Sequence, residues 1–443
     1  MAAPLRFYSP QASQLLLMVQ QIRAYERLPS AEQTRLQQTQ LFALLSHAWQ
    51  HSPWWQARLK NAGFDPTAPT LDAFQHLPPL TRSDIQSSFA KLRARTPDMQ
   101  EADIIVSTTS GSTGVPVQVE KDMRIYGQIY AAISWMEGLW HQRDARKKIA
   151  VLAVNVKDGS TSSWGGMYEV MDMHGPNVTR SLISGDMESH LAWLQAERPD
   201  YLKCSPMVAS ELAQLAIAKG ITLPIRQIIS QWERTTARHR ELCLQAFGAV
   251  IIDRYSCEEA GWLALPCPSH QNLHVVSASV LLEIVDDTGL PCPPGKVGRV
   301  LITSLHSTAM PIIRYDIGDL AEWGEPCGCG MTLPVIKQLR GRIRHQVHRH
   351  DGSLLPMAFL GDELGVIKAI GEFRILQYTG NELEIQIKWA SRPSDKDIQA
   401  IIKSFVDNGL GGLPLQIKSV AQIAWELGRK REEFTRLDIP LPR

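Results

Sequence analysis

The sequence predicts an α/β protein with a large N-terminal domain and a small α+β domain at the C-terminal end. Its 443 residues exceed what one ordinary hydrophobic core holds together. Between about residues 100 and 305, short β-branched runs alternate with longer helical patterns, which favours βαβ units on a largely parallel sheet. After residue 341 the chain turns polar and basic, and an alternating strand pattern follows. These three observations set the predicted fold class.

The N-terminal segment is expected to be helical. Leu15, Leu16, Val19 and Ile22 recur at helical spacing within residues 10–60. The central region then predicts strands at 149–154 and 249–252 and helices at 189–197 and 206–219. Residues 281–285 and 299–303 flank Asp-Thr-Gly and a Pro-Gly-rich segment, so this pair is predicted to be antiparallel.

Residues 341–352 contain few core side chains, so they are interpreted either as a solvated turn or as a hinge between domains. Beyond them, Leu383, Ile385 and Ile387 alternate with polar residues, as in a half-buried strand. A helix at 395–406 and a strand near 415–420 complete a predicted α+β unit of about 100 residues, a common domain size.

Composition restricts the function classes. Hydrophobic residues make up 44% and charged residues 21%, as in globular proteins. Lys plus Arg number 46 against 45 for Asp plus Glu, so no basic field attracts nucleic acid. No apolar run approaches the roughly 20 residues that span a bilayer, and the N-terminus does not resemble a signal peptide. Seven cysteines, an odd number, favour thiols or metal ligands in a reducing compartment. A cytoplasmic enzyme without membrane or nucleic-acid partners is expected.

The most informative stretch is rich in hydroxyl groups and glycine. It comprises Ser107, Thr108, Thr109, Ser110, Gly111, Ser112, Thr113 and Gly114, followed by Val115-Pro116. Glycines let backbone N–H groups close around an anion, and the hydroxyls add donors. A flexible surface loop is the alternative interpretation. The loop is not that of P-loop NTPases, because Gly-x-x-x-x-Gly-Lys-Ser/Thr is absent.

This loop resembles the phosphate-gripping loop of the adenylate-forming enzymes, and three further stretches follow in that family's order. They are residues 253–261 (DRYSCEEAG), 312–319 (IIRYDIGD) and Gly341-Arg342. The resemblance implies that Tyr255 lies near the adenine, Glu259 helps to hold Mg²⁺, Asp319 binds both ribose hydroxyls and Arg342 reaches the nucleotide. An ionised carboxylate suits a diol because it can accept two hydrogen bonds. Ser256 and Glu258 depart from the family, which usually has Gly and Thr or Ser there.

The chain is more narrowly similar to the phenylacetate–CoA ligase branch. The length, the run GRVLITSLHSTAMPIIRYDIGD (298–319), Cys-Gly-Cys-Gly (327–330) and Gly341-Arg342 carry this resemblance. It implies an adenylation domain (1–341) with parallel and mixed sheets and a β subdomain, and a mobile lid domain (342–443). It also implies ATP-dependent activation of an aryl or arylacetic acid to an acyl-adenylate, then transfer to coenzyme A. A homodimer is one option for assembly.

Four residues form a candidate zinc site: Cys267, His274, Cys327 and Cys329. Soft thiolates with one imidazole suit tetrahedral Zn²⁺, and relatives that carry the same residues resemble zinc proteins. His270 is the rival imidazole, and reduced structural cysteines are the alternative. Such a zinc would join the loop after Glu259 to the loop after Asp319.

Residues 426–434 (ELGRKREEF) resemble the family's terminal segment, in which a lysine neutralises charge between carboxylate and α-phosphate. Lys430 is the candidate, although Arg429 directly follows the glycine; a solvated charge run is the alternative. Trp164 and Trp232 are candidates either for substrate contact or for core packing.

Three alternatives stay open for the final step. The acyl group passes from the adenylate to coenzyme A, or it passes to an amine or a carrier-protein thiol. In the third alternative, the protein binds nucleotide but has lost catalysis. Arg344-His345 stands where relatives often carry Asp at the hinge. This difference bears on domain rotation and therefore on coenzyme A use.

Overall fold

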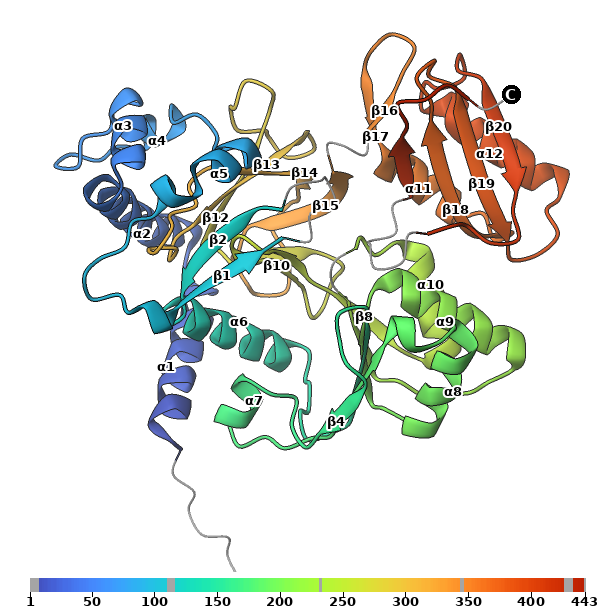
Figure 1. Ribbon diagram of the computed structural model, residues 1–443, viewed down its shortest axis with the longest axis horizontal. Coiled ribbons are helices and arrows are strands. Elements are labelled where there is room, and N and C mark those ends of the chain that lie inside the picture. The colour runs from blue at the N-terminus through green and yellow to red at the C-terminus, as the bar shows by residue number, and fades with distance from the viewer. Residues whose placement is uncertain (1–7, 110–115, 231–232, 343–345, 426–432, 442–443) are drawn as a thin grey trace, which may run out of the picture.

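The computed structural model describes residues 8–109, 116–230, 233–342, 346–425 and 433–441. Its N-terminal part is helical, which confirms the prediction for residues 10–60. The helices are α1 (Pro10–Tyr25), α2 (Ser30–His51), α3 (Pro53–Asn61), α4 (Leu71–Gln75) and α5 (Arg82–Ser88), followed by the 3₁₀ turns Phe89–Leu92 and Glu101–Asp103. The hydroxyl of Ser52 accepts the Trp55 N–H and caps α3. These helices cover one end of the molecule (Figure 1).

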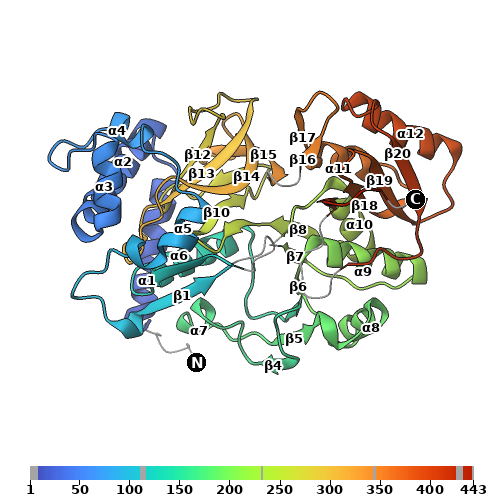
Figure 2. The ribbon, with the colours of Figure 1, turned by 45° about the horizontal axis from the view of Figure 1, so that its top comes forward.

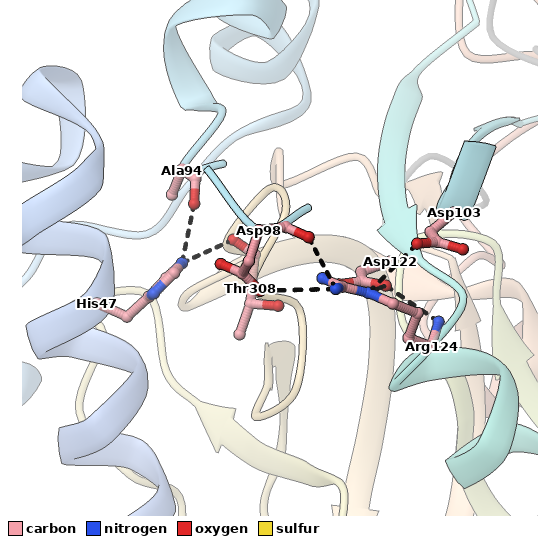
Figure 3. Close-up of polar contacts among 7 residues, drawn as sticks. All are labelled: His47, Ala94, Asp98, Asp103, Asp122, Arg124 and Thr308. Atoms are coloured by element: carbon pink, nitrogen blue, oxygen red, sulfur yellow. Dashed lines mark hydrogen bonds and ion pairs between the residues drawn. The ribbon is translucent and has the colours of Figure 1, made fainter. Parts of the chain in front are cut away.

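The hydroxyl-rich loop joins two antiparallel strands, β1 (Ile104–Thr108) and β2 (Gln118–Asp122). The base of this hairpin is fixed by Arg124, whose guanidinium contacts Asp98, Asp103 and Asp122 (Figure 3). Nearby, His47 Nε2 lies 2.9 Å from the carbonyl oxygens of Ala94 and Thr308 (Figure 3). Arg124 thus closes the base of the hairpin, and His47 joins α2 to the segments that carry Ala94 and Thr308.

The central region forms a six-stranded sheet with the order β4-β5-β3-β6-β7-β8. Its strands are β3 (Ile149–Ala153), β4 (Gly159–Thr161), β5 (Asn177–Ser181), β6 (Tyr201–Cys204), β7 (Gln227–Ser230) and β8 (Val250–Asp253). The helices of this region are α6 (Tyr126–Trp140), α7 (Met167–Val170), α8 (Met187–Glu197), α9 (Pro206–Lys219) and α10 (Ala237–Phe247). All pairs are parallel except β4–β5, so the largely parallel sheet is confirmed.

The chain then leaves the parallel sheet and builds a seven-stranded sheet with the order β12-β13-β14-β15-β11-β10-β9. Its strands are β9 (Tyr255–Cys257), β10 (Gly261–Pro266), β11 (Leu273–Val275), β12 (Val280–Val285), β13 (Val297–Ser304), β14 (Tyr315–Trp323) and β15 (Val335–Arg342). The predicted antiparallel pair at 281–285 and 299–303 is confirmed, since Val285 pairs with Arg299. The parallel sheet therefore ends at Asp253 and does not extend towards residue 305.

The C-terminal part has its own sheet, with the order β20-β19-β18-β21, and its own core (Figures 1 and 2). Its elements are β16 (Gln346–His348), β17 (Leu354–Pro356), α11 (Met357–Gly365), β18 (Ile370–Gln377), β19 (Leu383–Trp389), α12 (Asp395–Asp407), β20 (Leu415–Ser419) and β21 (Phe434–Arg436). Leu383, Ile385 and Ile387 are buried as predicted. Glu384 is buried too, contrary to the half-exposed pattern, because it pairs with Lys418 at 2.7 Å and accepts the Tyr378 hydroxyl.

Among the described residues, no helix combines the length and the apolar character that crossing a bilayer requires.

Candidate active site

A cavity of about 1810 Å³ lies where the hairpin, the strand ends of both large sheets and the C-terminal part meet. The described residues of the predicted nucleotide site all line it: Ser107, Thr108, Thr109, Tyr255, Glu259, Asp319 and Arg342. Sequence positions as far apart as 107 and 342 thus face one space. The remainder of the predicted phosphate loop, Ser110 to Gly114, lies outside the described residues.

The described edges of the phosphate loop are held as a hairpin. The Thr109 N–H donates to the Val117 carbonyl, and the Val117 N–H donates to Thr109 Oγ1, both at 2.9 Å. Arg82, at the start of α5, reaches the same hydroxyl at 3.4 Å and lines the cavity. The two described ends of the loop are therefore held together by hydrogen bonds.

Asp319 on β14 is oriented by two residues from other strands. The Tyr255 hydroxyl donates to Asp319 Oδ2 at 2.9 Å, and Arg342 Nε lies 3.4 Å from Oδ1. The β14–β15 register explains this meeting, since Asp319 and Arg342 are direct cross-strand partners. Burial raises the pKa of Tyr255, so its phenol stays a neutral donor. The expected position of Tyr255 near the adenine stays a prediction, and its contact with Asp319 is a further feature of the site.

Glu259 is buried in the turn between β9 and β10, where Tyr315 positions it. The Tyr315 hydroxyl donates to Glu259 Oε1 at 2.9 Å. Burial, and then the adjacent Glu259 charge, raise the pKa of Tyr315, which keeps it protonated as a donor. Tyr315 belongs to the same motif as Asp319, so β14 carries one site carboxylate and orients the other. A carboxylate held in this way is a suitable ligand for Mg²⁺.

The arginine of that motif has a different task. Arg314 is buried, is not among the residues that line the cavity, and pairs with Glu283 at 3.1 Å. Its guanidinium also donates to the backbone carbonyls of Leu77 and Gly289. Arg314 therefore fastens β14 to neighbouring loops and contributes stability rather than ligand contact.

A buried ion network holds the segment of chain that leads into Tyr255. Glu137 on α6 lies 2.6 Å from Arg143 Nη1 and 2.7 Å from Arg254 Nη2, and Arg254 directly precedes Tyr255. Burial raises the pKa of Glu137, but the charges of Arg254 and Arg143 outweigh this effect and lower it to about 2. No local sequence pattern indicates this network, because Arg254 lies 117 positions from Glu137 along the chain.

The four cysteine and histidine residues of the predicted metal site do converge. The ligand atoms of Cys267, His274, Cys327 and Cys329 all lie within 4.8 Å of one another. The sulfurs of Cys267 and Cys327 are 3.7 Å apart, and Cys329 Sγ is 3.3 Å from His274 Nε2. Two Zn–S bonds of about 2.3 Å at a tetrahedral angle separate sulfurs by about 3.8 Å, so these residues fit a zinc ion.

The rival imidazole is also close. His270 Nδ1 lies 3.2 Å from Cys327 Sγ and 3.7 Å from Cys267 Sγ. Both histidines therefore contact the thiol cluster, and distance alone does not separate them.

The tryptophan candidates differ in outcome. Trp164 packs edge-on against Tyr168 and Tyr201, and its N–H donates to the Lys147 carbonyl at 2.9 Å. It is not among the residues that line the cavity, which favours the packing interpretation. Trp232 and Lys430 lie outside the described residues.

Comparison with known proteins finds CoA ligases among the relatives of this chain. No family model matches the sequence. The chain is 25% identical to phenylacetate-coenzyme A ligase of Thermus thermophilus over 389 residues, which cover 84% of this chain and 85% of that protein. It is 24% identical to phenylacetate-coenzyme A ligase of Pseudomonas putida over 342 residues, 74% of each chain.

Solved structures show the same fold. 2-Hydroxyisobutyryl-CoA ligase in the postadenylation state has a TM-score of 0.72 at 20% identity and covers 94% of this chain and 91% of its own. In its thioesterification state that ligase has a TM-score of 0.60 at 21% identity, covering 93% of this chain and 91% of its own. An anthranilate CoA ligase has a TM-score of 0.53 at 16% identity and covers 73% of this chain and 65% of its own. The chain is thus similar in sequence to phenylacetate-coenzyme A ligases, and it shares its fold with 2-hydroxyisobutyryl-CoA ligase.

Proposed function

We propose that this enzyme uses ATP to convert a carboxylic acid, of aryl or arylacetic type, into an acyl-adenylate and then transfers the acyl group to coenzyme A. The observation that carries the proposal is the pair of oriented carboxylates. Asp319, held by Tyr255 and Arg342, and Glu259, held by Tyr315, face one cavity with the described part of the hydroxyl-rich hairpin. The curated relatives are phenylacetate–CoA ligases, which supports this acid class.

In this proposal each residue has a distinct task. Asp319 accepts hydrogen bonds from the ribose hydroxyls, and Arg342 lies beside the nucleotide. The phosphates lie against residues 107–114, and the acid's carboxylate oxygen attacks the α-phosphorus while pyrophosphate leaves. Mg²⁺ on Glu259 would neutralise phosphate charge. The protein contributes mainly position and fixed charge, which are the strongest terms for such a transfer.

Lys430 is the proposed cation at the reacting centre. Residues on both sides of its segment, Trp425, Glu433 and Phe434, line the cavity, which supports this assignment. Lys430→Ala should slow pyrophosphate release by about 10²-fold, on the scale of losing one preorganised donor. The variant should still consume supplied acyl-adenylate. Normal adenylation by Lys430→Ala together with a defect in Arg429→Ala would assign this role to Arg429. Normal adenylation by both variants would exclude a catalytic cation in this segment.

The division at residues 341 and 342 is proposed as the boundary of a mobile lid. Its support is the separate core of the C-terminal part, which runs from Val347 to Phe434. Rotation about residues 342–345 would exchange an adenylation site for a thiolation site, a step that limits turnover in many enzymes.

We also propose a structural zinc ion at Cys267, His274, Cys327 and Cys329. The 3.7 Å sulfur separation and the absence of a cavity-facing role for these residues support it. Reduced thiols are needed for such a site, which is consistent with a cytoplasmic location.

The deciding experiment measures pyrophosphate and AMP release with a panel of aryl and alkyl acids, with and without coenzyme A. We expect release with at least one aryl acid and faster AMP release when coenzyme A is present. Turnover that needs an amine instead would identify an amide-forming ligase. ATP binding without pyrophosphate release from any acid would identify a nucleotide-binding protein that has lost catalysis.

A further inference from the structure

Three aromatic side chains form a stacked row along one wall of the main cavity. Tyr126 and Tyr130 on α6 have ring centroids 5.9 Å apart at 25°, and Tyr130 lies 5.0 Å from Trp262 on β10 at 15°. The Trp262 N–H donates to Ser134 Oγ at 2.8 Å, so its polar atom is satisfied inside the protein. All three rings line the cavity, so the row gives this wall a continuous aromatic, largely apolar surface.

The position of this row is fixed by a glycine. Gly261, the first residue of β10, has a φ of +79°. A Cβ atom there would lie 2.7 Å from the Tyr126 hydroxyl oxygen and 3.3 Å from Tyr130. Only glycine allows β10 to pass this close to α6, so the row is part of the built wall and not a loose surface cluster.

A buried cation lies at the edge of the row. Lys121 on β2 has a side chain that is 5% exposed, and its Nζ lies 4.4 Å from the Tyr126 ring centroid and 3.2 Å from the Tyr126 hydroxyl. Burial lowers the pKa of Lys121, and the charge of Glu258 partly offsets this effect. An ammonium in such a place needs partners, since desolvating a charge is costly.

The ion pair of Lys121 is weak compared with those of its neighbours on β2. Glu258 Oε1 lies 3.5 Å from Lys121 Nζ, beyond the 2.7–2.9 Å of a charge-assisted hydrogen bond, and the Glu258 side chain is 48% exposed. By contrast, Glu120 meets Arg93 at 2.7 Å and Arg95 at 2.8 Å, and Asp122 meets Arg124 at 2.6 Å. Of these three charges on β2, only Lys121 lines the cavity.

The carboxylates of the proposed nucleotide site have partners other than this ammonium. Asp319 is paired with Tyr255 and Arg342, and Glu259 accepts from Tyr315. Glu258 already shows that a carboxylate fits beside Lys121. A ligand oxygen could replace Glu258 at little cost, because a half-exposed carboxylate regains water when it turns outward.

We propose that Lys121 makes this enzyme selective for planar acids that carry a second hydrogen-bond-accepting oxygen, as a hydroxyl, carbonyl or carboxylate group. The flat body of the acid lies against the row of Tyr126, Tyr130 and Trp262. Its second oxygen takes the place of the Glu258 carboxylate at Lys121 Nζ. This inference rests on the proposed acid activation and names the substrate class more closely.

The test compares matched acids on matched variants. Pyrophosphate release is measured for benzoate and phenylacetate and for their hydroxy- and carboxy-substituted forms, with wild-type protein, Lys121→Met and Lys121→Arg. The wild type should prefer at least one substituted acid by about tenfold or more in kcat/KM, because a site built to bind a polar group rejects analogues that lack it. Lys121→Met should abolish that preference, while its kcat/KM for the unsubstituted acids should stay the same or rise. Lys121→Arg should retain part of the preference.

Equal loss on all acids in Lys121→Met, with unchanged ATP affinity, would place Lys121 at the reacting carboxylate and overturn the inference. If Lys121→Met does not fold, Glu258→Gln carries the test: it should lower KM for substituted acids only, and an equal change for all acids would overturn the inference. A wild-type protein that releases no pyrophosphate with any acid would instead contradict the proposed function itself.

Discussion

At the scale of single residues, the site is organised by pairs in which one side chain orients another. Tyr255 and Arg342 approach the two oxygens of Asp319 from different strands. Tyr315 donates to one oxygen of Glu259. Fixed orientation matters because a preorganised carboxylate loses little entropy when it binds its ligand. The supporting tyrosines are therefore expected to affect affinity almost as directly as the carboxylates.

Asp319→Ala should weaken ATP binding without unfolding the protein. Removal of a charged hydrogen-bond acceptor should cost about 1.5–3 kcal/mol, roughly 10- to 150-fold in Kd. Calorimetric titration of ATP measures this loss, and a thermal melt checks folding. Asp316→Asn is the control on the same strand, since Asp316 pairs with Arg299 and does not line the cavity. Unchanged ATP affinity in folded Asp319→Ala would remove the ribose assignment.

Glu137→Gln should destabilise the protein by about 3–5 kcal/mol, since it leaves Arg143 and Arg254 buried without their carboxylate. Urea unfolding measures this change. The pKa of Glu137 is lowered from 4.5 to about 2, so its stabilising effect is fully present above pH 4.5. That effect is lost as the pH falls towards 2, so the stability difference between wild type and variant should shrink in that range. A difference that grows on acidification would contradict the assigned ion network.

At the scale of elements, the clearest consequence of strand register is the joining of distant loops. The β10–β11 connection carries Cys267 and His270, and the β14–β15 connection carries Cys327 and Cys329, which meet because β11 pairs with β15. A metal ion there would cross-link two loops that follow the site residues Glu259 and Asp319.

We expect about one zinc ion per chain in protein purified without added metal. Cys329→Ser should lose both the metal and thermal stability, because metal binding contributes directly to folding free energy. Metal analysis and melting temperature provide the two readouts. Cys292→Ser is the control, since Cys292 is buried elsewhere and lies outside the cluster. A fully stable, metal-free wild type would exclude the zinc site. The metal content of His270→Ala compared with that of His274→Ala would identify the fourth ligand.

Elements with local signals were predictable from the sequence, and contacts set by tertiary register were not. Helices such as α9 begin and end where the pattern and the capping Ser205 and Gly220 indicate. The motif residues were found through family resemblance. The ion network at Glu137 has no local pattern, and Glu120-Lys121-Asp122 has the appearance of a solvated charge run. All three of these side chains are instead buried. Glu120 pairs with Arg93 and Asp122 with Arg124, whereas the ion pair of Lys121 with Glu258 is longer.

At the scale of the whole molecule, polar contacts link the C-terminal part to the central region and to the seven-stranded sheet. Asp362 on α11 accepts from Arg234 at 2.6 Å and from Gln338 at 2.7 Å. Gln214 on α9 also donates to the Gly371 carbonyl at 3.2 Å. Such contacts are strong enough to favour one arrangement and weak enough to exchange during a cycle.

Asp362→Ala should broaden the range of domain arrangements in the nucleotide-free protein. Small-angle scattering should detect a larger and more heterogeneous radius of gyration, because Arg234 and Gln338 lose their shared acceptor. Glu363→Ala is a close control, since the adjacent Glu363 pairs with Asn408 within the C-terminal part. Identical scattering from both variants would show that Asp362 does not hold the two parts together.

The pairing of β21 with β18 has a further consequence, for the candidate Lys430. Phe434 is in register with Ile375, and the Trp425 N–H donates to Glu372 at 2.7 Å, so the chain is anchored on both sides of the segment. Lys430 lies four positions before Phe434, and a fully extended chain of four steps reaches at most about 14 Å. Loss of one residue would shorten this tether by about 3.5 Å, as much as the whole separation of atoms poised to react. With Lys430 in its proposed role, we therefore expect activity to depend more on the length of this segment than on its composition.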